Sequence, residues 1–181
     1  MKQNTVPEAV WRKAAVIRLV IFDVDGVLTD GSLFLGDNGQ EYKAFHSRDG
    51  HGMVMLRQAG VEIGVITGRT SEVVRIRMEA LGVREVFQGQ RDKRPAYETM
   101  KQRLGLTDGE IAYVGDDVVD LPVLTQVGLG IAVADAHPWV IERAHWQTRA
   151  GGGRGAVREV CELLLAARGQ LDALLSGYLT S

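Results

Sequence analysis

The 181-residue sequence has one cysteine, almost balanced charge and no long apolar run. The single thiol, Cys161, excludes an intrachain disulfide and is typical of a protein that works in a reducing cytoplasm. A formal net charge of −2 gives no indication of nucleic-acid binding. No stretch approaches the roughly 20 apolar residues of a membrane span, and the charges spread through residues 1–20 argue against a signal peptide. We therefore expect a cytoplasmic protein that binds neither nucleic acid nor membrane.

What the sequence does contain is the composition of an ordinary globular protein, with 45% apolar and 24% charged residues. The length suits one compact domain with a full hydrophobic core, and we expect residues 1–181 to form it. Near the C-terminus, a flexible loop is expected over the glycine cluster 151–155, before a helix and tail over 155–181. The apolar face of that helix consists of Val157, Val160, Cys161, Leu164 and Leu165. This spacing predicts a buried, structural thiol.

Short apolar runs rich in β-branched residues alternate with amphipathic helical patterns along the chain. The predicted strands cover 17–22, 61–66, 84–88, 111–115 and 129–133, and the predicted helices cover 51–59, 71–81, 93–104, 117–126 and 138–143. Each strand is almost continuously apolar, as a parallel strand buried on both faces should be. The alternation predicts an α/β fold with a doubly wound parallel sheet. In such sheets, ligands bind beyond the carboxyl ends of the strands.

One segment, residues 31–50, breaks this alternation. It has two short strand-like arms around the turn-rich centre "GDNGQ", which predicts a β-hairpin over 31–46. The hairpin has few residues of its own chain to pack against, and an apolar hairpin left bare favours contact with another chain. We interpret it as an oligomer contact rather than a free flap.

The polar residues that follow the predicted strands carry the strongest functional signal. Asp23 and Asp25 come directly after the first strand, although each also fits a polar turn. Thr67 follows the second strand, where a helix cap is the alternative, and Lys93 precedes a helix, where a surface charge is the alternative. The fourth strand runs straight into an acidic cluster that a solvated face does not explain, namely Asp116, Asp117 and Asp120.

Parallel strands would bring these residues to one edge of the sheet, where they suit Mg²⁺ and a phosphoryl group. Carboxylates with a few waters are the hard oxygen ligands that Mg²⁺ prefers. Thr67, Lys93 and backbone amides near Asp25 would donate hydrogen bonds to phosphoryl oxygens. An aspartate beside Mg²⁺ can attack phosphorus as a covalent nucleophile, and a second acid can protonate the leaving oxygen and later activate water. The pattern therefore indicates a Mg²⁺-dependent phosphoryl-transfer site.

In their order and position, these motifs resemble those of the haloacid dehalogenase superfamily of phosphatases. The match consists of "DVDGV" (23–27), Thr67, Lys93 and "GDDVVD" (115–120). The resemblance implies that Asp23 is the nucleophile and that Asp25 is the general acid and base. It also implies that Mg²⁺ is held by Asp23, the Asp25 carbonyl and Asp116.

The same resemblance gives the remaining motif residues supporting roles. Thr67 and Lys93 would bind the phosphoryl group, and Asp120 would orient the acidic loop, with Asp117 beside it behind the metal ligands. Larger members of the superfamily insert a cap domain, but here only the hairpin follows the first motif and no domain-sized insertion appears later. A capless enzyme must close its site in another way, and the hairpin of a neighbouring subunit could do so.

From Ile17 to Leu171, the sequence resembles the 3-deoxy-D-manno-octulosonate 8-phosphate phosphatases. The segments that carry this resemblance are "DVDGVLTDG", "KAFHSRDGHG", "ITGR", "YVGDDVVD", "VADAHP" and "GGGRGAVREVCELLL". Members of that family are homotetramers whose hairpins form a central barrel. The resemblance therefore implies a homotetramer with sites completed by neighbouring subunits, a small-molecule sugar phosphate as substrate, and a role in lipopolysaccharide core sugar synthesis.

The implied substrate is an acidic keto-sugar phosphate, and arginine suits recognition of its carboxylate. Arg69 follows the phosphate-binding threonine, and Arg77 is expected two helical turns further along the same helix face. Arg48 is expected in the exit strand of the hairpin, and Arg154 lies in the glycine cluster, although any of these arginines could instead form a surface salt bridge. By resemblance, the substrate contacts are Asp25, His46, Ser47, Arg48, Asp49, Gly50, Gly68, Arg69, Arg77 and Lys93.

The alternatives to this function differ in specific features. A related branch that acts on nine-carbon keto-acid phosphates tends to have Glu after the Thr-Gly pair, where this chain has Arg69. A phosphoacceptor receiver module uses similar residues and Mg²⁺, but it places the acceptor and the acid pair on different strands. A phosphosugar mutase would normally need a cap, and a silent scaffold would not need the full catalytic set. This chain also has His46-Ser47 where the family usually has Asn-Val, so His46 is either a hydrogen-bonding substitute or a pH-sensitive substrate contact.

Overall fold

A parallel six-stranded sheet forms the centre of the computed structural model, which describes residues 6–179. Its strands are β1 (Leu19–Phe22), β4 (Glu62–Ile66), β5 (Glu85–Phe87), β6 (Ile111–Gly115), β7 (Leu129–Ala132) and β8 (Trp146–Gln147). They are ordered β5-β4-β1-β6-β7-β8, and every neighbouring pair is parallel. All four residues of β1 are buried because helices cover both faces of the sheet, which is why the strand sequence is continuously apolar.

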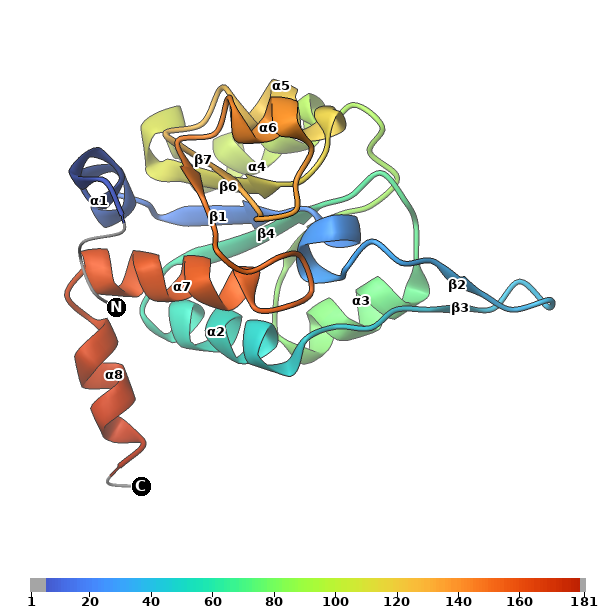
Figure 1. Ribbon diagram of the computed structural model, residues 1–181, viewed down its shortest axis with the longest axis horizontal. Helices are drawn as coiled ribbons and strands as arrows, with labels where there is room; N and C mark the ends of the chain where they lie inside the picture. Colours follow the sequence, from blue (N-terminus) through green and yellow to red (C-terminus); the bar gives the residue numbers. More distant parts are fainter. Residues whose placement is uncertain (1–5, 180–181) are drawn as a thin grey trace.

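Helices lie on both faces of this sheet, which confirms the predicted doubly wound α/β fold (Figure 1). One face is covered by α2 (Ser47–Gln58), α3 (Glu72–Ala80) and α7 (Ala156–Ala167). The other face is covered by α4 (Arg94–Leu104), α5 (Leu121–Leu124) and α6 (Pro138–Ile141). The remaining helices are α1 (Glu8–Ala15), which packs against α7, and α8 (Leu171–Gly177), which follows it. Within residues 6–179, none of the helices is long and apolar enough to cross a bilayer.

The topological switch point of the sheet lies beside β1. The chain passes from β1 to β4 and β5 on one side, and then returns to the other side of β1 with β6, β7 and β8. Loops that leave β1 and its two neighbours therefore diverge at their carboxyl ends and leave a crevice, where ligands of doubly wound sheets bind. These loops carry Asp23, Asp25, Thr67 and Asp116, whereas Lys93 comes from the loop after β5.

The elements differ from the predicted ones in a few places. Helix α1 and strand β8 were not predicted, and the predicted helix 117–126 is a 3₁₀ turn, Val118–Asp120, followed by the short α5. Helix α2 begins four residues before the predicted start at residue 51. Its periodicity is weak because two buried glycines, Gly50 and Gly52, take the place of apolar side chains and let α2 approach α3 and α7 closely.

The predicted hairpin is present as β2 (Phe34–Leu35) and β3 (Glu41–Tyr42), which project away from the body of the protein (Figure 1). Phe34 lies opposite Tyr42 in the antiparallel register. These two side chains are 52% and 57% exposed, and Leu35 is 66% exposed. Three large exposed apolar side chains on one short hairpin leave an unusually apolar surface for a single chain.

The C-terminal helix has the predicted buried face. All five of its predicted apolar residues, Cys161 included, are fully buried in α7. Burial raises the pKa of the Cys161 thiol, so it is an unreactive packing residue, as predicted. The expectations that concern residues 1–5 and 180–181 lie outside the described part of the chain.

Candidate active site

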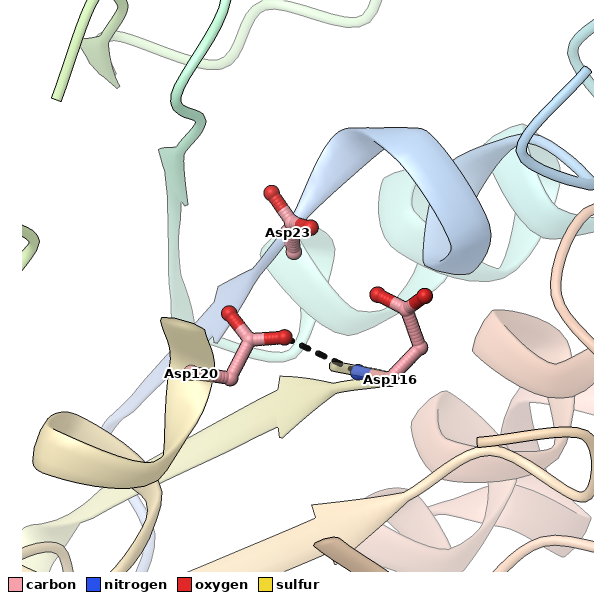
Figure 2. Close-up of side chains that lie close together, drawn as sticks. All are labelled: Asp23, Asp116 and Asp120. Carbon is pink, nitrogen blue, oxygen red and sulfur yellow. Dashed lines mark hydrogen bonds between the residues drawn. The ribbon is translucent and has the colours of Figure 1, made fainter. Parts of the chain in front are cut away.

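Three aspartates meet at the carboxyl ends of β1 and β6 (Figure 2). Asp23 follows the last residue of β1, Asp116 follows β6, and Asp120 ends the short 3₁₀ helix. Each offers one carboxylate oxygen, and these oxygens lie within 4.8 Å of one another. Such a concentration of negative charge away from bulk water needs a positive partner.

Part of the positive charge comes from Lys93, the residue that precedes α4. Its Nζ lies 2.9 Å from Asp23 Oδ1 and 2.6 Å from Asp120 Oδ1, and the side chain is almost completely buried. Burial alone would lower the pKa of Lys93, but the carboxylates of Asp23 and Asp120 outweigh it, so that the pKa of Lys93 is raised. The ammonium group therefore stays charged inside the site.

Asp120 holds the acidic loop together. Its Oδ1 also accepts a hydrogen bond from the Tyr113 hydroxyl at 2.6 Å, and its Oδ2 accepts from the backbone amides of Asp116 and Asp117 at 2.9 and 3.1 Å. The residue is completely buried, and both of its oxygens are saturated by donors. Asp120 therefore orients Lys93 and the loop, which leaves Asp23 and Asp116 as the side chains available to an ion.

The electrostatics of Asp23 and Asp116 fit a divalent cation. Burial, followed by the negative charge of Asp120, raises the pKa of Asp23 to about 7. The same two causes raise the pKa of Asp116 to about 8. In addition, Asp116 Oδ1 is buried and has no hydrogen-bond partner among residues 6–179. Two carboxylates that resist ionisation together, one with an unpartnered oxygen, fit the hard oxygen site that Mg²⁺ requires.

We expect Mg²⁺ to raise the unfolding temperature more at about pH 8.5 than at about pH 5.5. A raised carboxyl pKa stabilises the metal-free fold fully below the unfolded value of 3.8, and that stability is lost as the pH rises through about 7 for Asp23 and about 8 for Asp116. Above this range the two charges repel and a cation relieves them, whereas at the lower pH protons compete with it. Thermal unfolding with Mg²⁺ and with EDTA measures the difference. Equal stabilisation at both pH values would contradict this account. Asp116→Asn removes one of the two carboxyl groups with a raised pKa and should show a smaller pH dependence, with the contribution of Asp23 remaining.

Asp25 points toward the base of the hairpin and meets charged residues there. Lys43 Nζ forms an ion pair with Asp25 Oδ1 and lies 3.3 Å from Glu41 Oε1. Arg69 Nε lies 3.9 Å from Asp25 Oδ2, and Arg69 Nη2 lies 3.2 Å from Glu41 Oε1. The side chain of Lys43 is only 1% exposed. The hairpin therefore brings two charged residues of its own chain to the site.

Sequence reasoning missed Glu41, Lys43 and Tyr113, although each left a signal. Glu41 and Lys43 flank Tyr42, and the period of two along a strand puts them on the face opposite that exposed aromatic ring. Tyr113 is the single hydroxyl-bearing residue in the apolar strand β6, and a buried hydroxyl needs a partner. The partner is the carboxylate of Asp120, in the loop that follows the strand.

Thr67 and Gly68 follow β4, on the other side of β1 from the acidic loop. The Thr67 side chain is buried, and its hydroxyl accepts a hydrogen bond from the Arg69 amide at 3.4 Å. Gly68 is exposed. Because β4 is the direct neighbour of β1, both residues face the crevice that contains Asp23.

The prediction that Arg69 and Arg77 share a helix face is wrong. Helix α3 begins at Glu72, so Arg69 lies in the loop before it, whereas Arg77 lies within the helix. The Arg77 guanidinium lies over the Phe45 ring, 5.9 Å from its centroid. The loop between Thr67 and α3 thus separates the two arginines, and Arg77 packs against the segment that leaves the hairpin.

The segment 46–50 is the start of α2 rather than the exit strand of the hairpin, so the placement of Arg48 in a strand is also wrong. His46 precedes the helix, and Ser47 and Arg48 are exposed on its first turn. The side chain of Arg48 has no hydrogen bond or ion pair within residues 6–179 and points to solvent. This exposed turn is available to a substrate or to another subunit.

Asp49 and Gly50, the second part of the segment 46–50, form packing contacts inside the protein. Asp49 is buried, and its Oδ1 accepts a hydrogen bond from the Arg158 amide in the first turn of α7 at 2.8 Å. Burial is also what raises the pKa of Asp49. A side chain at Gly50 would collide with the guanidinium of Arg77. Asp49 and Gly50 therefore set the contacts of α2 with α7 and α3, and His46 Nδ1 lies 3.8 Å from Asp49 Oδ2.

Two further predicted residues form local contacts. The Asp117 carboxylate accepts a hydrogen bond from the Val118 amide at 2.7 Å and caps the 3₁₀ helix, while the residue itself is exposed. Arg154 Nη2 lies 2.9 Å from Asp30 Oδ2 in an exposed ion pair. Both contacts support loops next to the acidic cluster.

Comparisons with known proteins agree with this geometry. Residues 71–157 match the family model of the haloacid dehalogenase-like hydrolases. The 3-deoxy-D-manno-octulosonate 8-phosphate phosphatase of Escherichia coli is 50% identical over 163 residues, which cover 90% of this chain and 87% of that protein. The crystal structure of the phosphatase of that name from Yersinia pestis has a TM-score of 0.91 and 47% identity, and covers 92% of this chain and 90% of that one. The Moraxella catarrhalis phosphatase, crystallised with magnesium ion, phosphate ion and KDO, has a TM-score of 0.92 and 39% identity, and covers 93% of this chain and 97% of that one.

The doubly wound sheet has Asp23, Lys93 and Asp116 at one edge, in this order along the chain. This arrangement is that of the haloacid dehalogenase-like hydrolases, the class that the family model identifies independently. This class differs from receiver modules in placing Asp25 two residues after the first carboxylate, on the same strand end. Within the class, 50% identity over 90% of the sequence decides the family. The chain belongs to the 3-deoxy-D-manno-octulosonate 8-phosphate phosphatases.

Proposed function

We propose that this protein is a Mg²⁺-dependent phosphatase that hydrolyses 3-deoxy-D-manno-octulosonate 8-phosphate to 3-deoxy-D-manno-octulosonate and phosphate. The observation that carries the proposal is the buried group of Asp23, Asp116 and Lys93 at the switch point, in a chain 50% identical to a phosphatase of that name. A related structure that holds magnesium, phosphate and KDO supports both the cofactor and the product.

The reaction proceeds in two displacements at phosphorus. The Asp23 carboxylate attacks phosphorus, the bond to the sugar oxygen breaks, and the carboxyl group of Asp25 gives its proton to that oxygen. Water then attacks the aspartyl phosphate, Asp25 takes the proton, and phosphate leaves with the Asp23 carboxylate restored. Asp23, Asp116 and the Asp25 carbonyl would hold Mg²⁺, which neutralises phosphate charge when it is bound.

Thr67 and Lys93 are proposed to hold the transferring group. Both are buried: Thr67 follows β4, the neighbour of β1, and Lys93 precedes α4. A hydroxyl and an ammonium there can donate to the equatorial oxygens of the phosphoryl group. Lys93 also lies 2.9 Å from Asp23 Oδ1 and favours the ionised carboxylate that attack requires. Asp117 and Asp120 support the loop that carries Asp116.

The substrate carboxylate is proposed to bind arginine, since the planar guanidinium matches a carboxylate in two hydrogen bonds. Arg69 is the best placed candidate because its Nε approaches Asp25 and nearly half of its side chain remains exposed in the crevice. Gly68 beside it leaves room for the sugar, and Arg77 supports the rim from α3. Ser47 and Arg48 begin α2 with exposed side chains, which could reach a substrate in a neighbouring subunit, and the half-buried His46 precedes them.

We expect Arg69→Ala to lower kcat/KM for the eight-carbon sugar phosphate by about 10–100-fold, because a hydrogen-bonded ion pair with the substrate carboxylate is lost. Hydrolysis of a simple aryl phosphate, which has no carboxylate, should change much less. Initial rates of phosphate release on both substrates give the comparison. Equal losses would mean that Arg69 serves the phosphate or the packing instead.

We further propose a homotetramer, in which the exposed arms of the hairpins pack together. The side chains of Phe34, Leu35 and Tyr42 form the apolar surface that supports this assembly. Sedimentation velocity should find a particle of four chains, and Phe34→Glu with Leu35→Glu should dissociate it, because charge at a buried interface is costly. A monomeric wild-type protein would contradict the proposal.

The proposed setting is the cytoplasm, where the product would enter lipopolysaccharide core sugar synthesis. Support for the cytoplasm comes from the single buried thiol, which needs no oxidising compartment. Support for the product comes from the similarity to 3-deoxy-D-manno-octulosonate 8-phosphate phosphatases. This role in lipopolysaccharide core sugar synthesis requires that the enzyme prefer the eight-carbon substrate.

Phosphate release with Mg²⁺ and with EDTA, across a panel of sugar phosphates, tests the proposed function. The panel includes the eight-carbon and nine-carbon keto-acid phosphates. A metal-dependent kcat/KM at least about tenfold higher for the eight-carbon substrate is expected, which corresponds to about 1.4 kcal/mol of discrimination. A preference for the nine-carbon substrate would overturn the substrate assignment, and metal-independent release would overturn the mechanism.

A further inference from the structure

The glycine cluster 151–155 is packed against the loop that follows β1 and is not the flexible loop that its sequence predicts. The Gly153 amide donates a hydrogen bond to the Val27 carbonyl at 2.9 Å. Gly152 is buried, and a methyl group built on it would overlap the carbonyl oxygen of Gly26. The cluster is rich in glycine because two stretches of backbone touch directly.

The same loop also touches Asp116, the acid proposed to bind the metal. Gly26 has φ +98°, and a methyl group built on it would collide with the carboxylate of Asp116. The turn Val24–Leu28 passes beside Asp116 in Figure 2. This turn contains Asp25 and follows Asp23 directly, so the segment that bears both proposed reacting carboxyl groups is in close contact with both Asp116 and the glycine cluster.

One loop anchors both sides of this arrangement. Asp135, in the loop after β7, accepts a hydrogen bond from the Gly152 amide at 2.9 Å. Two residues further on, the His137 amide donates to the Asp116 carbonyl at 2.7 Å. The loop after β7 therefore fixes the backbone of Asp116 and the glycine cluster together, although Asp135 is not one of the three aspartates in the acidic group.

We propose that Asp135 and Gly152 are positioning residues that hold the loop bearing Asp23 and Asp25 at the distance from Asp116 that Mg²⁺ and the phosphoryl group require. The proposal rests on the phosphatase function proposed above. Gly152 supplies the close backbone approach, and Asp135 fixes Gly152. Displacing reacting groups by about 1 Å costs on the order of 100-fold in rate. Asp135 and Gly152 therefore influence the rate by fixing the loop, without contact to the substrate.

Gly152→Ala is the direct test, with Gly109→Ala as its matched control. Gly152 has no left-handed φ, so the new methyl group acts by pushing against the backbone of the loop after β1, at Gly26 and Thr29. At Gly109, the nearest atom to such a methyl group is 3.9 Å away, and that exposed turn lies at the amino end of the sheet. Gly152→Ala should lower kcat by about 10–100-fold with KM almost unchanged, and should raise the Mg²⁺ concentration for half-maximal rate. The control should match the wild type.

A second pair of variants keeps the test valid if Gly152→Ala does not fold. Asp135→Asn retains an oxygen that can accept from the Gly152 amide, whereas Asp135→Ala does not. Asp135→Ala should lower kcat and raise the Mg²⁺ requirement, and Asp135→Asn should restore both. Wild-type kcat and Mg²⁺ requirement in the folded Gly152→Ala variant, or equal values in the two Asp135 variants, would overturn the proposal.

The stabilisation of the protein by Mg²⁺ gives a readout that does not depend on turnover. The rise in unfolding temperature on adding Mg²⁺ should be smaller in Gly152→Ala than in the wild type or in Gly109→Ala. If the wild type hydrolyses no phosphate ester, the proposed function fails, and this comparison still decides whether the loop is positioned for the ion. An unchanged rise in Gly152→Ala would overturn the positioning role by itself.

Discussion

Asp23→Asn should reduce kcat by about 10⁴-fold or more, as removal of a nucleophile does in other enzymes. The amide cannot form the aspartyl phosphate, whereas Lys93 keeps its ion pair with Asp120. The fold should survive. Because burial and Asp120 raise the pKa of Asp23 to about 7, a neutral side chain there relieves repulsion near neutral pH. Phosphate release and thermal unfolding of the same sample measure both effects.

The combination of lost turnover with unchanged or higher stability is specific to a nucleophile in a repulsive acidic site. The matched control is Asp117→Asn, which changes an exposed acid in the same region. It should retain much of the activity, because an asparagine oxygen can still accept from the Val118 amide. Appreciable residual activity in Asp23→Asn would mean that another residue attacks phosphorus.

Asp120→Ala should lower the free energy of unfolding by about 3–5 kcal/mol and should also abolish activity. The change leaves the Lys93 ammonium buried with one carboxylate partner instead of two, and it removes the acceptor of the Asp116 and Asp117 amides. The loop that carries Asp116 then loses its fixed position. Urea denaturation of the metal-free protein gives the stability change.

Tyr113→Phe is the control for this second prediction. It removes one hydroxyl donor to Asp120 and leaves Lys93 and both backbone amides in place. The expected cost is about 1 kcal/mol, the usual value for one intramolecular hydrogen bond. If Asp120→Ala were no more harmful than Tyr113→Phe, Asp120 would not be the residue that holds the loop.

The sheet and the acids at its edge could be predicted because their signals are local. Buried parallel strands are continuously apolar, so Asp23 and Asp116 stand out as charges at the ends of such runs. The fold class then brings the strand ends together without any knowledge of side-chain contacts. Lys93 could be predicted only in combination with the acids and Thr67, because an isolated lysine in a loop has no distinguishing pattern.

The unpredicted parts depend on contacts between distant segments. Lys43 is buried only because the hairpin base folds back onto Asp25, and Asp49 is buried only because α2 meets α7. The cluster at 151–155 was expected to be flexible because glycine permits many conformations. In the folded protein the same lack of side chains serves close packing against Gly26. Composition alone does not distinguish these two uses of glycine.

Chemical trapping of the phosphoenzyme tests the central claim most directly. Wild-type protein is mixed with 3-deoxy-D-manno-octulosonate 8-phosphate and Mg²⁺, quenched during turnover, and reduced with borohydride, which converts an aspartyl phosphate to homoserine. Mass spectrometry of the peptides should find homoserine at position 23, and only when substrate and Mg²⁺ are both present. Homoserine at another aspartate, or rapid phosphate release with no modification of Asp23, would contradict the account.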